Sequence, residues 1–231
     1  MNRGLLVVGT DTGVGKTVIS TLLLAVLRKR GARVAAFKPV ETGCDPDPMD
    51  AIMLSEAAGA SDPLDVVCPY RFRLPAAPEA AARAEGRTID PDRLEECFAK
   101  LSAGGRFVLV EAAGGAGTPY APDMLGLDLA RLLDLPVLLV ARAVLGTVGQ
   151  TLVALHAVQS VGALCAGIVL SRVPGAVPGP EDPTNVPLIE AHAAPVPVLG
   201  VLPRLPEPAP SSIEDLAALI EDHVDVDRIL R

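Results

Sequence analysis

The sequence is poor in aromatic residues and in positive charge. It has no tryptophan, and aromatic residues make up 3% of the 231 residues. Proteins that bind single-stranded nucleic acid stack bases on aromatic side chains, so this composition disfavours that class. The chain has 20 Lys and Arg against 28 Asp and Glu, a net charge of -8. This balance argues against a nucleic-acid partner and against docking to an anionic membrane.

Closely spaced cysteines and long apolar runs are also absent. The four cysteines lie far apart, without C-x-x-C or Cys/His zinc spacing, which favours buried thiols in a reducing cytoplasm. The apolar run Leu5–Val8 is too short for a signal peptide. The most apolar window, Leu152–Leu170, contains His156 and Gln159, so we predict a helix followed by a buried strand. We therefore expect a cytoplasmic protein that does not enter the membrane.

Half of the residues are hydrophobic, enough for one α/β domain over residues 1–231. Short runs that are apolar on both faces predict strands at Leu5–Val8, Val34–Lys38, Phe107–Glu111, Val137–Ala141, Gly167–Leu170 and Val198–Val201. Helical patterns lie between them, at Thr17–Arg30, Asp50–Ala58, Pro91–Ala103, Gly126–Leu133, Val148–Val161 and Ser212–Asp222. This alternation predicts a doubly wound, mainly parallel sheet with helices on both faces. The proline-rich stretches Pro174–Pro187 and Pro195–Pro210 are expected to be surface loops.

The first predicted strand runs into the stretch VVGTDTGVGKTVIS. It resembles a phosphate-binding loop, but the usual pattern G-x-x-x-x-G-K-[ST] needs a glycine at position 10, and the glycine here is Gly9. Strand, glycines, Lys16, Thr17 and helix still form the context in which backbone N–H groups face an anion. Lys16 can reach the terminal phosphates and Thr17 can offer a hydroxyl to Mg²⁺. We therefore predict a nucleotide phosphate site, in a fold like that of P-loop NTPases.

Two further strands end on charged residues. Lys38 ends the second predicted strand, and ligands of open α/β sheets bind at the carboxyl ends of strands, so Lys38 is expected to face the γ-phosphate or the attacking group. Glu111 is expected to end a buried strand, where an acid can hold Mg²⁺ directly or through water. A surface position remains the alternative for Lys38.

Together these segments resemble the dethiobiotin synthetase family. The motifs are G-T-D-T-x-V-G-K-T (Gly9–Thr17), K-P-V-x-[ST]-G (Lys38–Gly43), V-E-x-A-G-G (Val110–Gly115) and L-G-x-x-P (Leu199–Pro203). The resemblance covers nearly the whole chain and implies a homodimeric cyclo-ligase that depends on ATP and Mg²⁺. Its substrates would be 7,8-diaminononanoate and CO₂, joined as a carbamate, phosphorylated by ATP and closed to the ureido ring.

The resemblance also implies roles for particular residues. It assigns the catalytic contacts with phosphate and carbamate to Thr12, Lys16 and Lys38. It assigns nucleotide binding to Gly13, Val14, Gly15, Lys16, Thr17, Val18, Glu111, Ser171, Pro203 and Leu205. It assigns the metal to Thr17, Asp50 and Glu111. Substrate binding falls to Thr42, Leu145, Gly146, Thr147 and Gln150, with the segment from Leu145 onward coming from the other subunit.

Some positions depart from the family pattern. Many relatives have an acid at the position of Gly13 and glycine at that of Ala112. Where relatives often have an asparagine near the adenine base, this chain has Ser171, so the base-recognising group is left open. Asp45 and Asp47 lie near Asp50 and are alternative metal ligands, and Asp50 is alternatively only a helix N-cap.

Two other classes of protein share the expected fold. A synthetase of the cobyrinate amidase type usually carries a further glutamine amidotransferase domain, for which these 231 residues have no counterpart. A partitioning or membrane-cycling ATPase would have a signature lysine at position 11, which here is Asp11. The mainly acidic C-terminal segment also argues against membrane docking.

Overall fold

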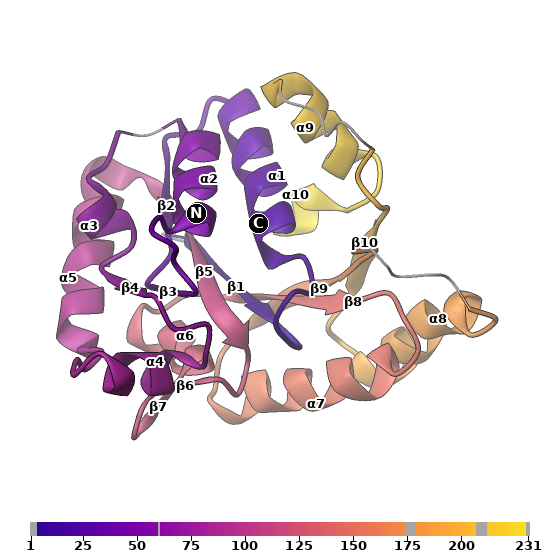
Figure 1. Ribbon diagram of the computed structural model, residues 1–231. Helices are drawn as coiled ribbons and strands as arrows, with labels where there is room; N and C mark the ends of the chain where they lie inside the picture. The colour runs from indigo at the N-terminus through magenta and orange to yellow at the C-terminus, as the bar shows by residue number, and fades with distance from the viewer. Residues whose placement is uncertain (1–3, 60, 174–178, 207–211, 230–231) are drawn as a thin grey trace.

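The protein is described by a computed structural model that covers residues 4–59, 61–173, 179–206 and 212–229. Its centre is a six-stranded sheet in the order β10-β9-β8-β1-β5-β2, and every neighbouring pair in it is parallel (Figure 1). The strands are β1 (Gly4–Gly9), β2 (Val34–Phe37), β5 (Phe107–Gly115), β8 (Val137–Arg142), β9 (Cys165–Ser171) and β10 (Val198–Leu202). The six predicted strands and the parallel fold class are confirmed.

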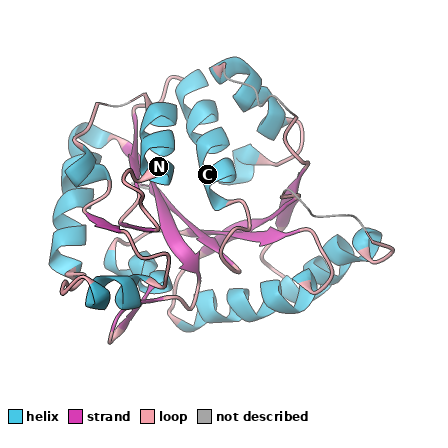
Figure 2. Cartoon of the chain, in the orientation of Figure 1, coloured by secondary structure: helices cyan, strands magenta, loops and turns pink. Residues whose placement is uncertain are grey.

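Helices cover both faces of this sheet (Figure 2). On one face lie α1 (Lys16–Lys29), α2 (Met49–Ala58), α9 (Ile213–Glu221) and α10 (Val226–Ile229). On the other lie α4 (Pro78–Ala84), α5 (Pro91–Ser102), α6 (Leu129–Leu132), α7 (Thr147–Ser160) and α8 (Asp182–Ala193). Among the described residues, no helix is both long and apolar enough to cross a membrane.

The core is divided into two by the sheet. Successive strand side chains point to opposite faces, so Leu5 and Val7 of β1 join one buried cluster while Leu6 and Val8 join the other. Both clusters are fully apolar along β1, which is why this strand reads as a continuous apolar run.

Short elements and one helix differ from the sequence-based expectation. The predicted helix Gly126–Leu133 is a 3₁₀ turn, η2 (Gly126–Asp128), followed by α6. Within the first proline-rich stretch, α8 begins at Asp182, so the expectation of a loop up to Pro187 is wrong there. Residues 174–178 and 207–211 of the two proline-rich stretches lie outside the described residues. The structure adds α3 (Leu64–Val67), η1 (Ala103–Gly105), β3 (Val40–Thr42), β4 (Tyr70–Phe72), β6 (Pro119–Ala121) and β7 (Met124–Leu125).

A buried tyrosine holds the carboxyl end of β5. The Tyr120 side chain is 0% exposed, and its hydroxyl oxygen accepts a hydrogen bond of 2.6 Å from the N–H of Ala113. Tyr120 thereby joins the small β6–β7 hairpin to the strand that carries Glu111 two residues earlier. Gly126 makes room for the ring, because a Cβ at that position would lie 2.9 Å from it.

Removal of this hydroxyl is expected to destabilise the protein. In Tyr120→Phe the buried N–H of Ala113 loses its acceptor, and we expect the free energy of unfolding in urea to fall by about 1–3 kcal/mol. Tyr70→Phe is the matched control, since Tyr70 accepts from the N–H of Asp90, an exposed residue that water can reach. Equal losses in the two variants would show that Tyr120 contributes no special stability.

Candidate active site

The phosphate loop lies between β1 and α1, at the carboxyl edge of the sheet. Gly13 (φ 67°) and Gly15 (φ 97°) adopt left-handed backbone conformations that favour glycine. Gly15 is the N-cap of α1 and provides no side-chain cap, so the first N–H groups of this helix are open to a bound anion. The loop thus has the form that phosphate binding requires.

Lys16 lies at the first turn of α1 and is buried. Its Nζ donates to the backbone carbonyl oxygen of Asp11 at 3.1 Å. Burial lowers the pKa of Lys16 from 10.5 to about 8, against the opposing effect of the Glu111 carboxylate. The protein therefore holds a desolvated cation where the terminal phosphates of a nucleotide would lie.

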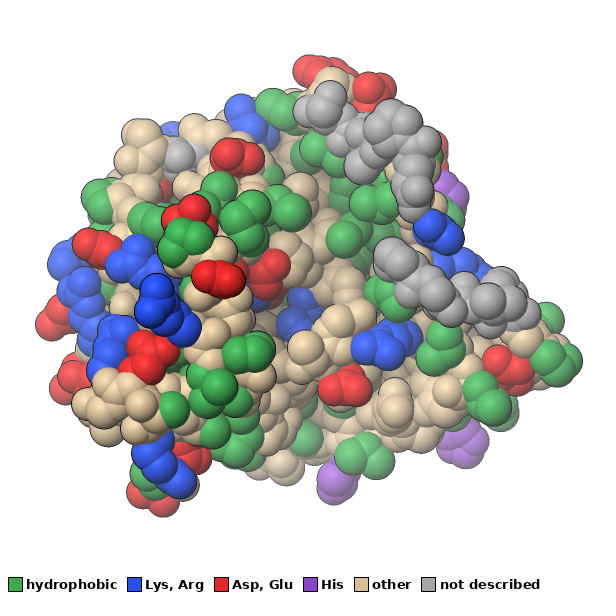
Figure 3. Space-filling view, viewed as in Figure 1, with side chains coloured by type: hydrophobic (Ala, Val, Ile, Leu, Met, Phe, Trp, Pro, Cys, Tyr) green, Lys and Arg blue, Asp and Glu red, His purple; other side chains and the backbone are tan. Residues whose placement is uncertain are grey.

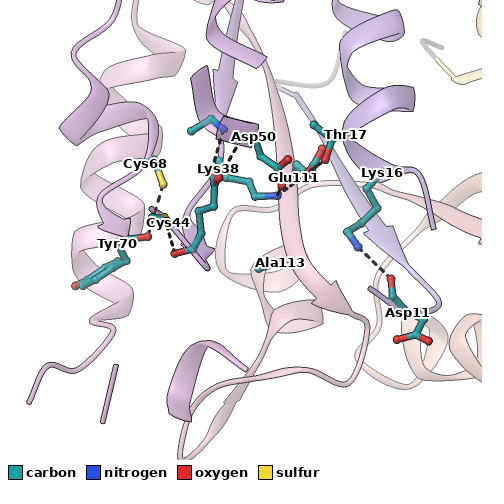
Figure 4. A network of polar contacts seen from close by, with 12 residues as sticks. Asp11, Lys16, Thr17, Lys38, Cys44, Asp50, Cys68, Tyr70, Glu111 and Ala113 are labelled. Atoms are coloured by element: carbon teal, nitrogen blue, oxygen red, sulfur yellow. Dashed lines mark hydrogen bonds and ion pairs between the residues drawn. The ribbon is translucent and has the colours of Figure 1, made fainter. Parts of the chain in front are cut away.

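A second lysine is buried between two carboxylates (Figure 4). Lys38 Nζ donates to Glu111 Oε1 at 2.5 Å and to Asp50 Oδ2 at 2.7 Å. Burial by itself would lower the pKa of Lys38, but Glu111 and Asp50 outweigh it and hold the pKa above its usual value. Thr17 completes the cluster, because its hydroxyl donates to Glu111 Oε1 at 2.9 Å. Side chains from β5, α1, α2 and the end of β2 therefore meet at one point.

The position of Glu111 corrects one expectation. Glu111 lies inside β5, which continues to Gly115, and not at the strand's end. Its side chain is 0% exposed, and Oε2 is buried and has no hydrogen-bond partner among the described residues. A buried carboxylate oxygen without a partner is costly, and a divalent cation would satisfy it.

The donor set fits Mg²⁺ better than a soft metal. Thr17, Asp50 and Glu111 offer only oxygen atoms, the ligands that Mg²⁺ prefers. Among the described residues, no three His, Cys, Asp or Glu side chains gather into a metal-binding group. An ion held by these three residues would therefore take its remaining ligands from nucleotide phosphates and water, as is usual for Mg²⁺.

These residues line a cavity of about 420 Å³ at the carboxyl edge of the sheet. Its charged walls are two lysines and three acids: Lys16, Lys38, Glu41, Asp50 and Glu111. On the face shown in Figure 3, acidic and basic side chains lie close together around a hollow near the centre. The cavity offers backbone N–H groups, two cations and a carboxylate pair, which together suit transfer of a phosphoryl group.

Comparison with known proteins identifies the family. The model of a family described as an AAA domain matches residues 3–212. The ATP-dependent dethiobiotin synthetase of Anaeromyxobacter sp. (strain K) is 46% identical over 193 residues, 83% of this chain and 84% of that protein. The enzyme of the same name from Bacillus licheniformis is 36% identical over 231 residues, 99% of this chain and 96% of that protein. The chain belongs to the ATP-dependent dethiobiotin synthetase family.

A solved structure supports the fold independently. The chain resembles the MinC:MinD cell division protein complex of Aquifex aeolicus with a TM-score of 0.55 and 15% identity, over 100% of this chain and 95% of that one. At this identity the likeness concerns the fold alone. Membership of the synthetase family decides against the partitioning ATPase alternative, in agreement with Asp11 at the signature position.

Most of the phosphate, nucleotide and metal residues expected from the synthetase family line the cavity. The expected residues found in its wall are Thr12, Gly13, Gly15, Lys16, Thr17, Val18, Lys38, Thr42, Asp50 and Glu111. Asp50 is the second residue of α2 and so is not its N-cap. Asp45 and Asp47 are exposed and do not line the cavity, so the structure brings only Asp50 to Lys38.

Four residues of the expected nucleotide set lie outside this wall. Val14 is buried under the loop. Ser171 ends β9 and lies against the loop, since a Cβ on Gly15 would lie 2.6 Å from its Oγ. Pro203 and Leu205 follow β10, beyond the neighbouring strand end.

The expected substrate segment of the synthetase family also lies apart from the cavity. Gly146 (φ 92°) is the N-cap of α7, Thr147 is buried, and Leu145 is 78% exposed. Gln150 lines a second groove of about 600 Å³, between the leading half of the phosphate loop and α7. Within one chain, therefore, only Thr42 of the expected substrate residues reaches the cavity.

Two charged residues of the site were not expected from the sequence. Glu41 occupies the variable position of K-P-V-x-[ST]-G and lines the cavity. Arg142 ends β8 and donates from Nη2 to the carbonyl oxygen of Thr12 at 2.7 Å. The sequence did contain a signal for Arg142, because this charged residue comes directly after the predicted buried strand Val137–Ala141.

Replacing Lys16 should raise stability while abolishing nucleotide use. In the folded protein the cation costs about 3 kcal/mol at neutral pH, as the lowered pKa implies. Lys16→Met should therefore raise the free energy of unfolding in urea by about this amount at pH 7. As pH rises from about 8 to 10.5, folded Lys16 loses its proton before the unfolded chain does, so the advantage of Met should shrink. Lys100→Met, at an exposed lysine, is the control, and a pH-independent difference would contradict the burial argument.

Proposed function

We propose that the chain converts 7,8-diaminononanoate and CO₂ to dethiobiotin with ATP, at the cavity formed by the phosphate loop, Lys38 and Glu111. The names of its relatives support this reaction. The observation that carries the assignment to this cavity is the buried Lys38, 2.5 Å from Glu111, beside the open N-terminus of α1.

The reaction has three steps. One amine of the substrate attacks CO₂ and loses a proton, which gives a carbamate. A carbamate oxygen then attacks the γ-phosphorus of ATP, and ADP leaves. Finally the second amine attacks the carbonyl carbon of the mixed anhydride, phosphate and a proton leave, and the ureido ring closes.

The main difficulty is the second step, in which an anion attacks a polyanion. Catalysis of phosphoryl transfer depends chiefly on positioning and on neutralising spread negative charge. Lys16 and Lys38 both line the cavity, where Lys16 would neutralise the β- and γ-phosphates and Lys38 the carbamate and the transferred phosphoryl group. Thr12 and Thr42 also line the cavity and would orient the two reacting anions.

Mg²⁺ would be held by Thr17, Asp50 and Glu111. The unpartnered Oε2 of Glu111 supports this assignment. When bound, the ion would neutralise phosphate charge and orient the β- and γ-phosphates. Because Lys38 now bonds both carboxylates, its Nζ is free to face the carbamate only if those bonds are exchanged on ligand binding.

The adenine base would lie beyond the phosphate loop. Ser171 ends β9 and lies next to Gly15, and Pro203 and Leu205 follow β10, the strand that pairs with β9. We propose these three residues as contacts of the base, with phosphates bound by Gly13 to Val18.

A homodimer would complete the substrate site. Leu145 and Val153 are 78% and 72% exposed at the start and on the outer side of α7. Two such apolar residues beside the groove that Gln150 lines favour coverage by a second copy. The N–H groups of the first turn of α7, which have no side-chain cap, would then bind the substrate carboxylate in the partner's site.

Diamine-dependent phosphate release tests the reaction. With ATP, Mg²⁺ and bicarbonate, we expect phosphate release only when diaminononanoate is present. Lys38→Met should lower kcat about 100- to 1,000-fold, because a charge that stabilises the transition state is lost. Lys100→Met, on the exposed side of α5, is expected to keep full activity. Hydrolysis at the same rate without the diamine would refute the ligase assignment, and normal turnover of Lys38→Met would refute the role of Lys38.

Sedimentation velocity tests the dimer. A charge at the centre of the proposed interface should separate the subunits, so Val153→Asp is expected to sediment as a monomer with at least tenfold lower turnover. Leu164→Asp introduces the same charge at another exposed apolar residue, beyond the C-terminal end of α7, and should leave the dimer intact. A fully active monomeric wild type would contradict the shared site.

A further inference from the structure

Helix α2, which carries Asp50, begins without a capping side chain of its own. Its N-cap position is Pro48, and that residue makes no side-chain hydrogen bond to the helix. The first N–H groups of any helix have no partner inside it, and Ser, Thr, Asp or Asn usually supplies one from the N-cap. The N–H groups of Asp50 and Ala51 therefore need an acceptor from elsewhere in the chain.

Glu41, on β3, is that acceptor. Its Oε1 accepts from the N–H of Asp50 at 3.0 Å and its Oε2 from the N–H of Ala51 at 2.9 Å. Glu41 is 8% exposed, so these bonds are shielded from water. A carboxylate at this place also lies at the positive end of the helix dipole.

These two hydrogen bonds to the backbone fix α2 relative to Lys38. Glu41 comes three residues after Lys38 in the chain. The Asp50 carboxylate in turn accepts a hydrogen bond from Lys38, with 2.7 Å between Lys38 Nζ and Asp50 Oδ2. The side chain of Asp50 is 41% exposed, so packing alone does little to hold it. Its backbone, in contrast, is tied through Glu41 to the strand that follows Lys38.

We propose that Glu41 is a positioning residue, which holds Asp50 where it can bind the divalent cation. The proposal rests on the proposed function of the cavity. Although Glu41 also lines the cavity, both of its oxygens are engaged by backbone N–H groups. Glu41 therefore acts through Asp50 and not as a third carboxylate ligand.

Binding of Mn²⁺ to the protein with ADP, measured by electron paramagnetic resonance, tests this role without turnover. Glu41→Ala should weaken Mn²⁺ binding about tenfold, as loss of groups that orient metal ligands usually does. The Mn²⁺ affinity of Glu41→Gln should lie between those of Glu41→Ala and the unmodified protein, because the Gln amide oxygen can still accept a hydrogen bond from one N–H group. Amide hydrogen exchange at Asp50 and Ala51 should be slowest in the unmodified protein, faster in Glu41→Gln and fastest in Glu41→Ala.

A second helix provides the matched control. Asp90 caps α5 by accepting from the N–H of Asp92 at 3.0 Å, so Asp90→Ala removes a carboxylate cap from a helix whose N-terminus does not line the cavity. We expect this variant to lose stability but to bind Mn²⁺ normally. Unchanged Mn²⁺ affinity in Glu41→Ala would overturn the proposal and leave Glu41 as a structural cap. Absence of Mn²⁺ binding in the unmodified protein would overturn the metal site itself.

Discussion

The buried contact between Lys38 and Glu111 is the constraint around which the active site is organised. The two side chains are 4% and 0% exposed; Glu111 lies in β5, and Lys38 directly follows β2, the parallel neighbour of β5. A buried charge without its partner costs several kcal/mol, so each of these residues requires the other to be in place. Thr17 and Asp50 are bonded to the same pair, which couples the phosphate loop and α2 to the sheet. The geometry of this cluster therefore follows from the register of β2 against β5, and the loops need only complete it.

This arrangement is not optimal for the stability of the folded chain. In the part of the chain that the structure describes, Lys16 is buried without a carboxylate in direct contact, and Glu111 Oε2 has no hydrogen-bond partner. Groups of this kind are destabilising until a ligand satisfies them. Nucleotide phosphates would satisfy Lys16 and a divalent cation would satisfy Glu111, so binding and stability are coupled through the same atoms. The cavity has three carboxylates and two lysines, so it has no excess of positive charge until a cation is bound. This charge balance also couples ligand binding to stability.

The sequence predicts the sheet and most of the site for a simple physical reason. Strands buried on both faces, such as β1, must be apolar throughout, and residues that follow such strands must lie at one edge of the sheet. Lys38 and the phosphate loop could therefore be placed without coordinates. Local sequence patterns predict less where the structure depends on contacts between residues that are far apart in the sequence. Helix α8 has prolines at positions 183 and 187 and reads as a loop, yet it packs on α7. Glu41 is at the variable position of its motif. Its role depends on hydrogen bonds from two N–H groups of α2, which only the folded chain brings near it.

The early glycine of the phosphate loop has a structural explanation of the same kind. A Cβ on residue 9 would lie 2.7 Å from the carbonyl oxygen of Asp11 and 2.9 Å from the side chain of Val14, so the loop folds back closely over Gly9. The next residue needs no such freedom. The N–H of Thr10 bonds the carbonyl oxygen of Val140 in β8 at 2.9 Å, which continues the strand pairing by one residue. Arg142, from the same strand, then holds Thr12, and a Cβ on Gly13 would lie 3.3 Å from its guanidinium. The leading half of the loop is thus shaped by β8 and not by a glycine at position 10, which leaves its second half, Gly13 to Thr17, with the geometry that phosphate binding needs.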